Sequence, residues 1–227
     1  MMPSPRLALF FAPAADSALW RAGSAWLGRD AETGAACMQP DLPGIAAVTA
    51  EPRRYGFHAT LKPPFRLAAG VTMEAAMTAI EALAGAIAPF TLPRLAVAEL
   101  GAFLALRETA PCPRLQALAD LAMAWPDALR APPDAAETAR RLRAGLTPVE
   151  ARMLERWGYP YAFGTWSFHM TLTGPLAEPD RRSWRRAAEN FLAPALAEAP
   201  ELRDIAVFVE SAPGAPLRLT RRVRLGR

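Results

Sequence analysis

Histidine, cysteine and lysine are scarce in this chain, and each scarcity narrows what the protein can do. The 227 residues include two histidines and two cysteines, and Lys62 is the only lysine. Cys37 and Cys112 fit no metal-binding spacing and form no disulfide framework, which favours a reducing, cytoplasmic location. Two imidazoles without a nearby cluster of carboxylates or cysteines would leave a zinc ion under-coordinated, so we expect no metal and no cofactor.

Long apolar runs are missing as well. No stretch approaches the roughly 20 residues of a membrane-spanning helix, so we expect no membrane partner. The residues after Arg6 faintly resemble a signal peptide, but the run is short and Pro13 interrupts it, which favours a strand that ends in a turn. The contents of 52% apolar and 21% charged residues are typical of a globular protein with a real core.

Positive charge is in mild excess, with a formal net charge of +4. This excess suits an anionic ligand. Because the arginines are dispersed along the chain instead of being gathered in one stripe, we expect a small phosphorylated substrate, with nucleic acid as a less favoured partner. The sequence does not indicate an oligomeric state.

Both histidines occur in the same pentapeptide frame, Phe57-His58-Ala59-Thr60-Leu61 and Phe168-His169-Met170-Thr171-Leu172. Strand side chains alternate between the two faces of a sheet, so each frame predicts a histidine and a threonine on one face and apolar residues on the other. A single frame would most simply be structural. Two matched copies indicate the two halves of one site.

The remaining pattern predicts a repeated order of elements. Each half has a motif strand, a helix and a hairpin. The first half is expected at 54–61 (ending at Pro63-Pro64), 72–89 (opened by Thr72), 91–99 and 102–107; the second at 166–173, 180–197 (capped by Asp180), 203–210 and 216–224. A strand at 6–12 and a helix at 17–27 capped by Asp16 precede them, and 28–54 is expected to be a loop.

We therefore predict an α+β fold with two pseudo-symmetric lobes, each an antiparallel sheet with flanking helices, facing each other across a central groove. The single bilobal domain 1–227 would divide into lobes at about 29–111 and 158–227, with 1–28 packed on one of them. A helical insert at about 112–157 lies between the lobes and contains a capping box at Thr147–Glu150. The insert is interpreted as a lid, a wall of the groove or a plain connector.

A matched pair of imidazoles is suited to opposed acid and base chemistry. The free pKa of histidine near 6.5 allows one ring to accept a proton while the other donates one. In-line displacement at phosphorus needs a base and an acid on opposite sides of one atom. In this interpretation Thr60 and Thr171 would hydrogen-bond the non-bridging oxygens, and Lys62 or an arginine would neutralise developing charge. The near symmetry of the pair leaves open which histidine is the base.

The paired motifs resemble those of the 2H phosphoesterase superfamily, which has two lobes, one His-x-Thr or His-x-Ser in each, and metal-independent activity on phosphodiesters. Further segments resemble the branch called domain of unknown function 1045, whose members are commonly encoded beside phosphonate-utilisation genes. These segments are Leu9–Pro13, Leu19-Trp20, Trp26–Asp30, Arg54–Phe65, Phe103–Arg107 and Trp157–Tyr161.

The resemblance implies that His58 and His169 are the catalytic acid and base, with Thr60 and Thr171 as phosphate contacts. Candidates for the substrate groove are Arg54, Tyr55, Arg107, Tyr159, Tyr161 and Thr173. One departure is that 162–165 reads Ala-Phe-Gly-Thr where the family pattern leads us to expect an acidic residue.

Three functions remain open at this stage. The first is a hydrolase of a small cyclic phosphate ester, linked to phosphonate metabolism. The second is an RNA-end enzyme that acts on 2′,3′-cyclic phosphates or forms 2′,5′ linkages, which would need a continuous basic groove. The third is a non-catalytic protein that binds a phosphorylated ligand.

Overall fold

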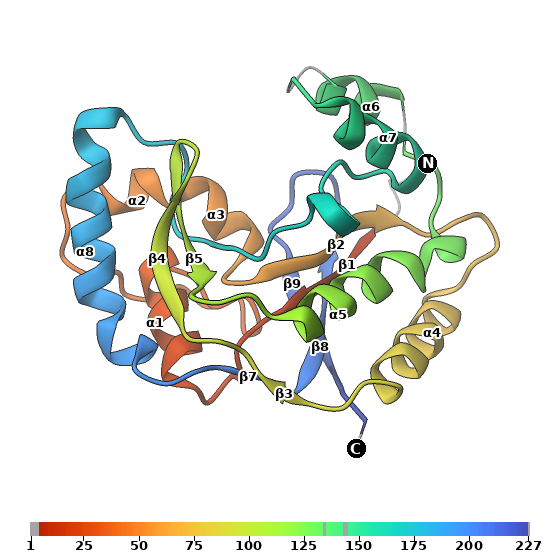
Figure 1. Ribbon diagram of the computed structural model, residues 1–227, viewed down its shortest axis with the longest axis horizontal. Coiled ribbons are helices and arrows are strands. Elements are labelled where there is room, and N and C mark those ends of the chain that lie inside the picture. Colours follow the sequence, from red (N-terminus) through yellow and green to blue (C-terminus); the bar gives the residue numbers. More distant parts are fainter. Residues whose placement is uncertain (1–4, 134, 143–144, 227) are drawn as a thin grey trace.

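A seven-stranded antiparallel sheet runs through the centre of the molecule (Figure 1). The structure is a computed structural model that describes residues 5–133, 135–142 and 145–226. In spatial order the strands are β4 (Leu95–Leu100), β5 (Phe103–Glu108), β6 (Met170–Thr171), β2 (Ala59–Arg66), β1 (Arg6–Phe11), β8 (Asp204–Glu210) and β9 (Arg218–Arg224). A separate two-stranded sheet pairs β3 (Phe90–Thr91) with β7 (Glu201–Leu202).

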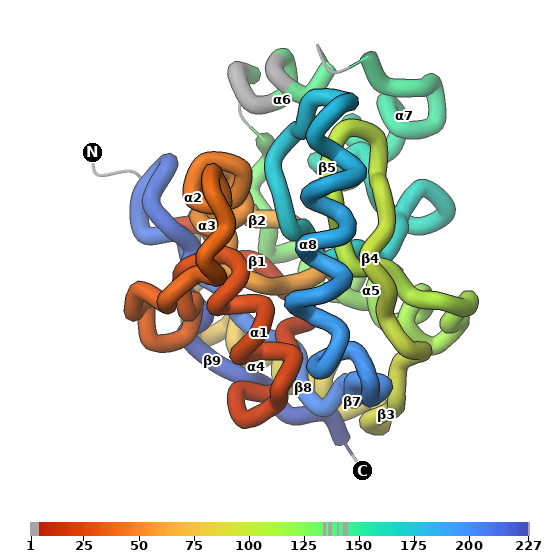
Figure 2. The backbone as a smooth tube through the Cα atoms, turned by 90° about the vertical axis from the view of Figure 1, so that its left-hand side faces the viewer, coloured from red at the N-terminus to blue at the C-terminus, as the bar shows by residue number. Residues whose placement is uncertain are grey.

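Helices surround the sheet. The long helix α8 (Glu178–Leu196) packs on β4 and β5 and lies beside α1 (Ala18–Leu27), as Figure 2 shows from the side. Helices α4 (Met73–Gly85) and α5 (Pro113–Ala124) pack against β9 and β2, respectively. In the described part of the chain, no helix combines the length and apolar character needed to cross a membrane.

The predicted helical insert is present. After α5 it contains a 3₁₀ turn, η1 (Asp127–Leu129), and then α6 (Ala135–Leu142) and α7 (Pro148–Trp157), which project together from one end of the molecule (Figure 1). The expected capping box opens α7, where Thr147 and Glu150 exchange hydrogen bonds. Residues 134 and 143–144 of the insert, like 1–4 and 227 at the chain ends, lie outside the described residues.

The α+β class with antiparallel sheets is confirmed, but the lobe boundaries at 29–111 and 158–227 do not match the sheet. The hairpin β4–β5 pairs with β6, the motif strand of the second half, and β8–β9 joins β1. Strand β1 links the second hairpin to the first motif strand, because it pairs with β2 on one side and with β8 on the other. The two hairpins are thus exchanged between the halves, and the halves are joined where β2 meets β6.

Three local expectations were wrong. Ser17, not Asp16, caps α1, because its Oγ accepts a hydrogen bond from the Trp20 backbone nitrogen at 3.0 Å. Asp180 lies inside the first turn of α8, which begins at Glu178. The expected loop 28–54 contains two short helices, α2 (Ile45–Val48) and most of α3 (Ala50–Tyr55), so the motif strand begins only at Ala59.

Pro63 and Pro64 do not end the motif strand. Strand β2 continues through them to Arg66, with a register shift opposite β1 between the pairs Leu9–Lys62 and Leu7–Phe65. The prolines occupy this bulge, where the ladder has no regular donor to lose. On the other side of β2 the pairing with β6 is confined to Ala59, so proline removes no hydrogen bond there either.

The two-residue periodicity of the motifs is confirmed. The apolar residues of both frames are buried in the main core: Phe57, Ala59, Leu61, Phe168, Met170 and Leu172. The histidines and threonines of both frames remain partly exposed on the opposite face. Strand β1 alternates in the same way, so that Phe10 belongs to a smaller cluster on the face that carries His58.

Gly23 of α1 generates a prediction about stability. In a helix, glycine to alanine normally stabilises by about 0.5–1 kcal/mol. A Cβ at position 23, however, would lie 2.2 Å from the buried Phe57 ring, directly before His58. We expect Gly23→Ala to lower the free energy of unfolding by about 1–3 kcal/mol, as overpacking does. Urea unfolding measures the change, with Gly85→Ala, where an added Cβ meets no atom within 4 Å, as the control. Equal stabilities of the two variants would contradict this packing.

Candidate active site

One backbone pairing brings the two motifs together. Ala59 of β2 lies opposite Met170 of β6 in an antiparallel register. Continued by one residue in each direction, this register sets His58 across from Thr171 and Thr60 across from His169. All four side chains share one face of the sheet, where directly opposed Cβ atoms are about 4.5–5.5 Å apart. The two His-x-Thr pairs therefore form one four-cornered cluster.

Both imidazoles are oriented by the same local contact. His58 Nδ1 lies 2.8 Å from the Gly56 carbonyl oxygen, and His169 Nδ1 lies 2.9 Å from that of Ser167. A carbonyl only accepts hydrogen bonds, so we assign the proton of each neutral ring to Nδ1. Each Nε2 is then free to accept a proton. The Thr60 hydroxyl, 3.3 Å from His58 Nε2, donates to it.

The surroundings of the two rings differ. His58 stacks on Phe10 with ring centroids 3.8 Å apart, and Phe208 and Tyr55 flank it at 5.9 and 6.5 Å. His169 contacts one aromatic ring in the described part of the structure, that of Phe103, at 6.2 Å. The two histidines thus occupy the same position in matching Phe-His-x-Thr-Leu frames but have different aromatic neighbours.

These surroundings lower both pKa values. Burial lowers the pKa of His58 to about 4, against the raising effect of the Gly56 carbonyl, and the charge of His169 lowers it further. Burial also lowers the pKa of His169; the Ser167 carbonyl opposes this, Arg107 adds to it and Glu108 opposes it. In the free protein at neutral pH, His58 is therefore uncharged, and the pKa of His169 is shifted in the same direction.

Two cavities adjoin the cluster and share Tyr55, His58 and Thr171. One, of about 340 Å³, is otherwise lined by Glu51, Pro52, Gly56, Phe103, Thr173, Gly174 and Pro175. The other, of about 270 Å³, is otherwise lined by Arg6, Phe10, Thr60, Pro63, Pro64, Arg141 and Tyr159. Among the described residues, the first cavity is lined by one acidic residue and by no arginine or lysine, and the second by two arginines and no acidic residue.

Lys62 is not at this site, contrary to the expectation that it binds phosphate. Its ammonium donates to the Met123 carbonyl oxygen at 2.7 Å and pairs with Asp127 at 3.3 Å, and its side chain is 1% exposed. Alternation along β2 does place it on the face of His58 and Thr60. That end of the strand, however, is covered by the C-terminus of α5 and by η1, which enclose the ammonium.

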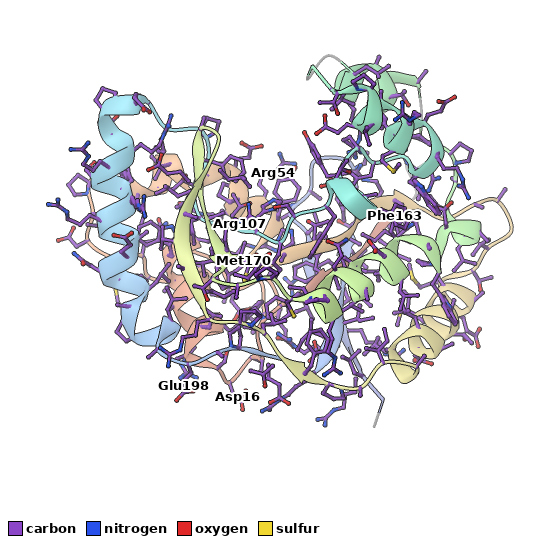
Figure 3. The ribbon with its side chains drawn as sticks, in the orientation of Figure 1. Asp16, Arg54, Arg107, Phe163, Met170 and Glu198 are labelled. Atoms are coloured by element: carbon purple, nitrogen blue, oxygen red, sulfur yellow. The ribbon has the colours of Figure 1, made fainter. Side chains whose placement is uncertain are left out.

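The candidate groove residues divide into two groups. Tyr55 and Tyr159 line the cavities. Buried Thr173 also lines one of them, and its hydroxyl accepts a hydrogen bond from the Leu104 backbone nitrogen, which fastens the segment after β6 to β5. Arg107 influences His169 electrostatically. Arg107 and Met170 lie near the centre of the view in Figure 3, whereas Asp16 and Glu198 lie at its lower end.

Arg54 and Tyr161 are not among the lining residues. Arg54 is exposed and donates to the Gly214 carbonyl oxygen at 3.0 Å, on the loop between β8 and β9. Tyr161 is also exposed and packs edge-on against Tyr159, with ring centroids 5.5 Å apart. Its contact with the site is through Tyr159.

Several residues of the site carried no recognised signal in the sequence. Gly56 and Ser167 each orient a histidine two positions later, and this shared spacing could have been read from the two frames. Phe10 could not, because its contact with His58 depends on the register in which Phe10 of β1 lies opposite Thr60 of β2. The Trp166 side chain also joins the two motifs by donating to the Thr60 carbonyl oxygen at 2.8 Å.

Comparison with known proteins adds a family and partial relatives. A family model described as "Protein of unknown function (DUF1045)" matches residues 60–218. Two curated proteins named ribose 1,5-bisphosphate phosphokinase PhnN are each 40% identical to this chain. The protein from Janthinobacterium sp. (strain Marseille) matches over 93% of this chain and 49% of its own length, and that from Laribacter hongkongensis (strain HLHK9) over 97% and 52%. The chain thus spans about half the length of these relatives.

Two solved structures are similar at low sequence identity. A crystal structure of E. coli LigT complexed with NADP+ matches with a TM-score of 0.44 and 16% identity, covering all of both chains. A crystal structure of a phosphoesterase matches with a TM-score of 0.42 and 14% identity, covering 99% of this chain and 100% of its own.

The two histidines can be titrated directly by proton NMR, since each contributes one C2-proton signal. We expect the His58 signal to titrate near pH 4 and the His169 signal below pH 6.5. In the protein unfolded by urea, both signals should titrate at about pH 6.5. The variant His58→Gln shows which signal belongs to which histidine.

The same shift predicts how stability depends on pH. Because the folded pKa of His58 lies below its unfolded value, the contribution of His58 to stability is fully present above about pH 6.5 and is lost as pH falls toward 4. A folded-state pKa above 7 for either ring would contradict the burial described.

Proposed function

Because the chain belongs to the DUF1045 family and the register of β2 and β6 gathers two His-x-Thr pairs into one cluster, we propose that it is a metal-independent phosphodiesterase of the 2H type that hydrolyses a small cyclic phosphate ester. The observation that carries this proposal is the pairing of Ala59 with Met170, which sets two imidazoles and two hydroxyls on one face. A phosphate seated between them would have a proton acceptor on one side and a proton donor on the other.

The reaction we propose uses His58 as the base and His169 as the acid. His58 Nε2 takes a proton from water as the water oxygen attacks phosphorus. The bond between phosphorus and the departing alkoxide oxygen breaks, and His169 protonates that oxygen. The cyclic ester thereby opens to a phosphate monoester and a free hydroxyl. Thr171 donates to a non-bridging oxygen, and Thr60 can turn from His58 Nε2 to do the same.

The assignment of roles is supported by the electrostatics. The pKa of His58 is lowered to about 4, mainly by burial, which keeps it neutral and able to accept a proton. Burial also lowers the pKa of His169, but the Ser167 carbonyl and Glu108 oppose this, whereas Arg107 adds to it. A bound phosphate anion would raise the pKa of both rings further, because an opposite charge favours the protonated form. In this scheme the substrate itself promotes protonation of His169.

The cavity linings and the relatives support a phosphorylated sugar as the substrate. The cavity with Arg6 and Arg141 suits an anionic group, and the cavity with Glu51 suits sugar hydroxyls. The partly matching relatives are named for an enzyme of ribose 1,5-bisphosphate. A cyclic phosphate of a ribose derivative, formed in phosphonate metabolism, would fit both observations.

The test is turnover on a panel of a ribose 1,2-cyclic phosphate, a nucleoside 2′,3′-cyclic phosphate and a 2′,5′-linked dinucleotide. We expect the ribose ester to be preferred. His58→Asn and His169→Asn should each lower kcat about 10³-fold, and Thr60→Val or Thr171→Val about 10- to 100-fold. Preference for either nucleotide would favour the RNA-end function. If the folded protein bound but never cleaved the panel, the hydrolase proposal would be wrong and a ligand-binding role would replace it.

Chelation tests the metal-free chemistry separately. We expect turnover to be unchanged after dialysis against EDTA, because the neutral His58 ring accepts one proton and the protonated His169 ring donates the other, and kcat/KM should follow a bell-shaped pH profile. The comparison is made on one protein preparation, with and without added Mg²⁺ or Mn²⁺ after dialysis. Loss of turnover that either cation restores would overturn a mechanism based on histidines alone.

A further inference from the structure

Lys62 is buried without a role in the proposed reaction. It is the only lysine of the chain and lies on β2, two residues beyond Thr60. A lysine is almost never fully buried unless it is paired, because an unpaired ammonium is costly to remove from water. Here the ammonium donates to the Met123 carbonyl oxygen in the last turn of α5, a group that has no partner within a regular helix.

The ionic partner of Lys62 joins three segments. Asp127 Oδ1 lies 3.3 Å from Lys62 Nζ and 2.8 Å from Arg130 Nε, and its Oδ2 lies 3.0 Å from Arg156 Nη1. Burial opposes ionisation of Asp127, but the Arg130 hydrogen bond and the Lys62 charge outweigh it, so its pKa is lowered. One carboxylate therefore connects the motif strand β2 with α7 of the insert.

This connection leads directly to the candidate active site. Arg156 is in the last turn of α7, and Arg130 also donates to its carbonyl oxygen at 3.4 Å. Three residues later Tyr159 lines the cavity beside His58 and Thr60. Because α6 and α7 project from the body of the molecule (Figure 1), the Asp127 junction is one attachment of the segment that carries Tyr159.

We propose that Lys62 is a positioning residue, which acts through Asp127 to hold α7, and with it Tyr159, against the catalytic strand. This inference rests on the proposed function for its kinetic effect. Lys62 touches none of the reacting groups. Because Lys62 lies two residues beyond Thr60 on β2, it couples the position of Tyr159 to that of the proposed phosphate-contacting threonine.

The kinetic test compares Lys62→Met, Asp127→Asn and Arg156→Gln with the wild type on the panel substrate that is turned over. We expect KM to rise at least about fivefold in all three while kcat changes by less than about threefold, because the wall that binds substrate shifts and the histidines do not. Arg152→Gln, an exposed arginine on the same helix, is the control and should leave both constants unchanged. An unchanged KM in Lys62→Met, or a loss confined to kcat, would overturn the proposal.

The pH dependence of KM provides a readout that a purely structural role would not move. Burial lowers the pKa of Lys62 to about 8, although Asp127 opposes this. The other charges around the ammonium are Arg130 and Arg156, and Arg6 and Arg66 line a third cavity, which Lys62 also lines. We expect the wild-type KM to rise above about pH 8 and Lys62→Arg to lack this rise, because arginine keeps its proton. The same alkaline rise in Lys62→Arg would assign it to another group.

Hydrogen exchange separates a failure of this inference from a failure of the proposed function. If no panel substrate is turned over, the phosphodiesterase proposal fails, but the junction can still be measured. Lys62→Met and Asp127→Asn should accelerate amide exchange across residues 148–161 while leaving β1 protected, and Arg152→Gln should not. Unchanged exchange in α7 of a folded Lys62→Met protein would overturn the positioning role whatever the activity.

Discussion

The pairing of Ala59 with Met170 is the constraint on which the candidate site depends. A slip of one residue would turn a motif histidine into the core and an apolar neighbour into the cavity, since side chains alternate along a strand. The buried partners of both frames oppose such a slip. Two indole hydrogen bonds add to this: Trp166 donates to the Thr60 carbonyl, and Trp26 donates to the Leu172 carbonyl at 3.0 Å. Packing and hydrogen bonding thus fix one register, and that register creates the cluster.

The exchange of hairpins makes this register a property of the whole chain. Strand β2 is held by β1, which β8 holds in turn, while β6 is held by β5 from the first half. Each motif strand is therefore supported by segments from both halves of the sequence. Neither half contains a complete set of partners for its own motif, which argues that the site assembles together with the sheet and not lobe by lobe.

The accuracy of the sequence-based predictions follows the range of the interactions involved. Alternation along a strand is local, so it correctly separated His58 and Thr60 from Phe57 and Leu61. The capping box of α7 is local too. Lys62 was misplaced because alternation tells which face a side chain takes but not which segment covers that face, and the end of α5 comes from 61 residues further along the chain. The exchanged hairpins were missed for the same reason, because an apolar strand pattern does not specify its partner. Ser17 and Asp16 are equally good caps, and only geometry separates them.

Near-identical motifs need not be chemically equivalent, and here the difference comes from what covers them. Phe10, Phe208 and Tyr55 surround His58, so its charged form is disfavoured. His169 lies instead among groups of both signs, Arg107 and Glu108, with one aromatic neighbour among the described residues. A phosphate seated between the rings would act on both, but only His169 has a carboxylate among the groups that shift its pKa. Burial thus disfavours the protonated form of both rings, but only at His169 does a carboxylate oppose this effect, and a symmetric motif acquires a direction from an asymmetric sheet.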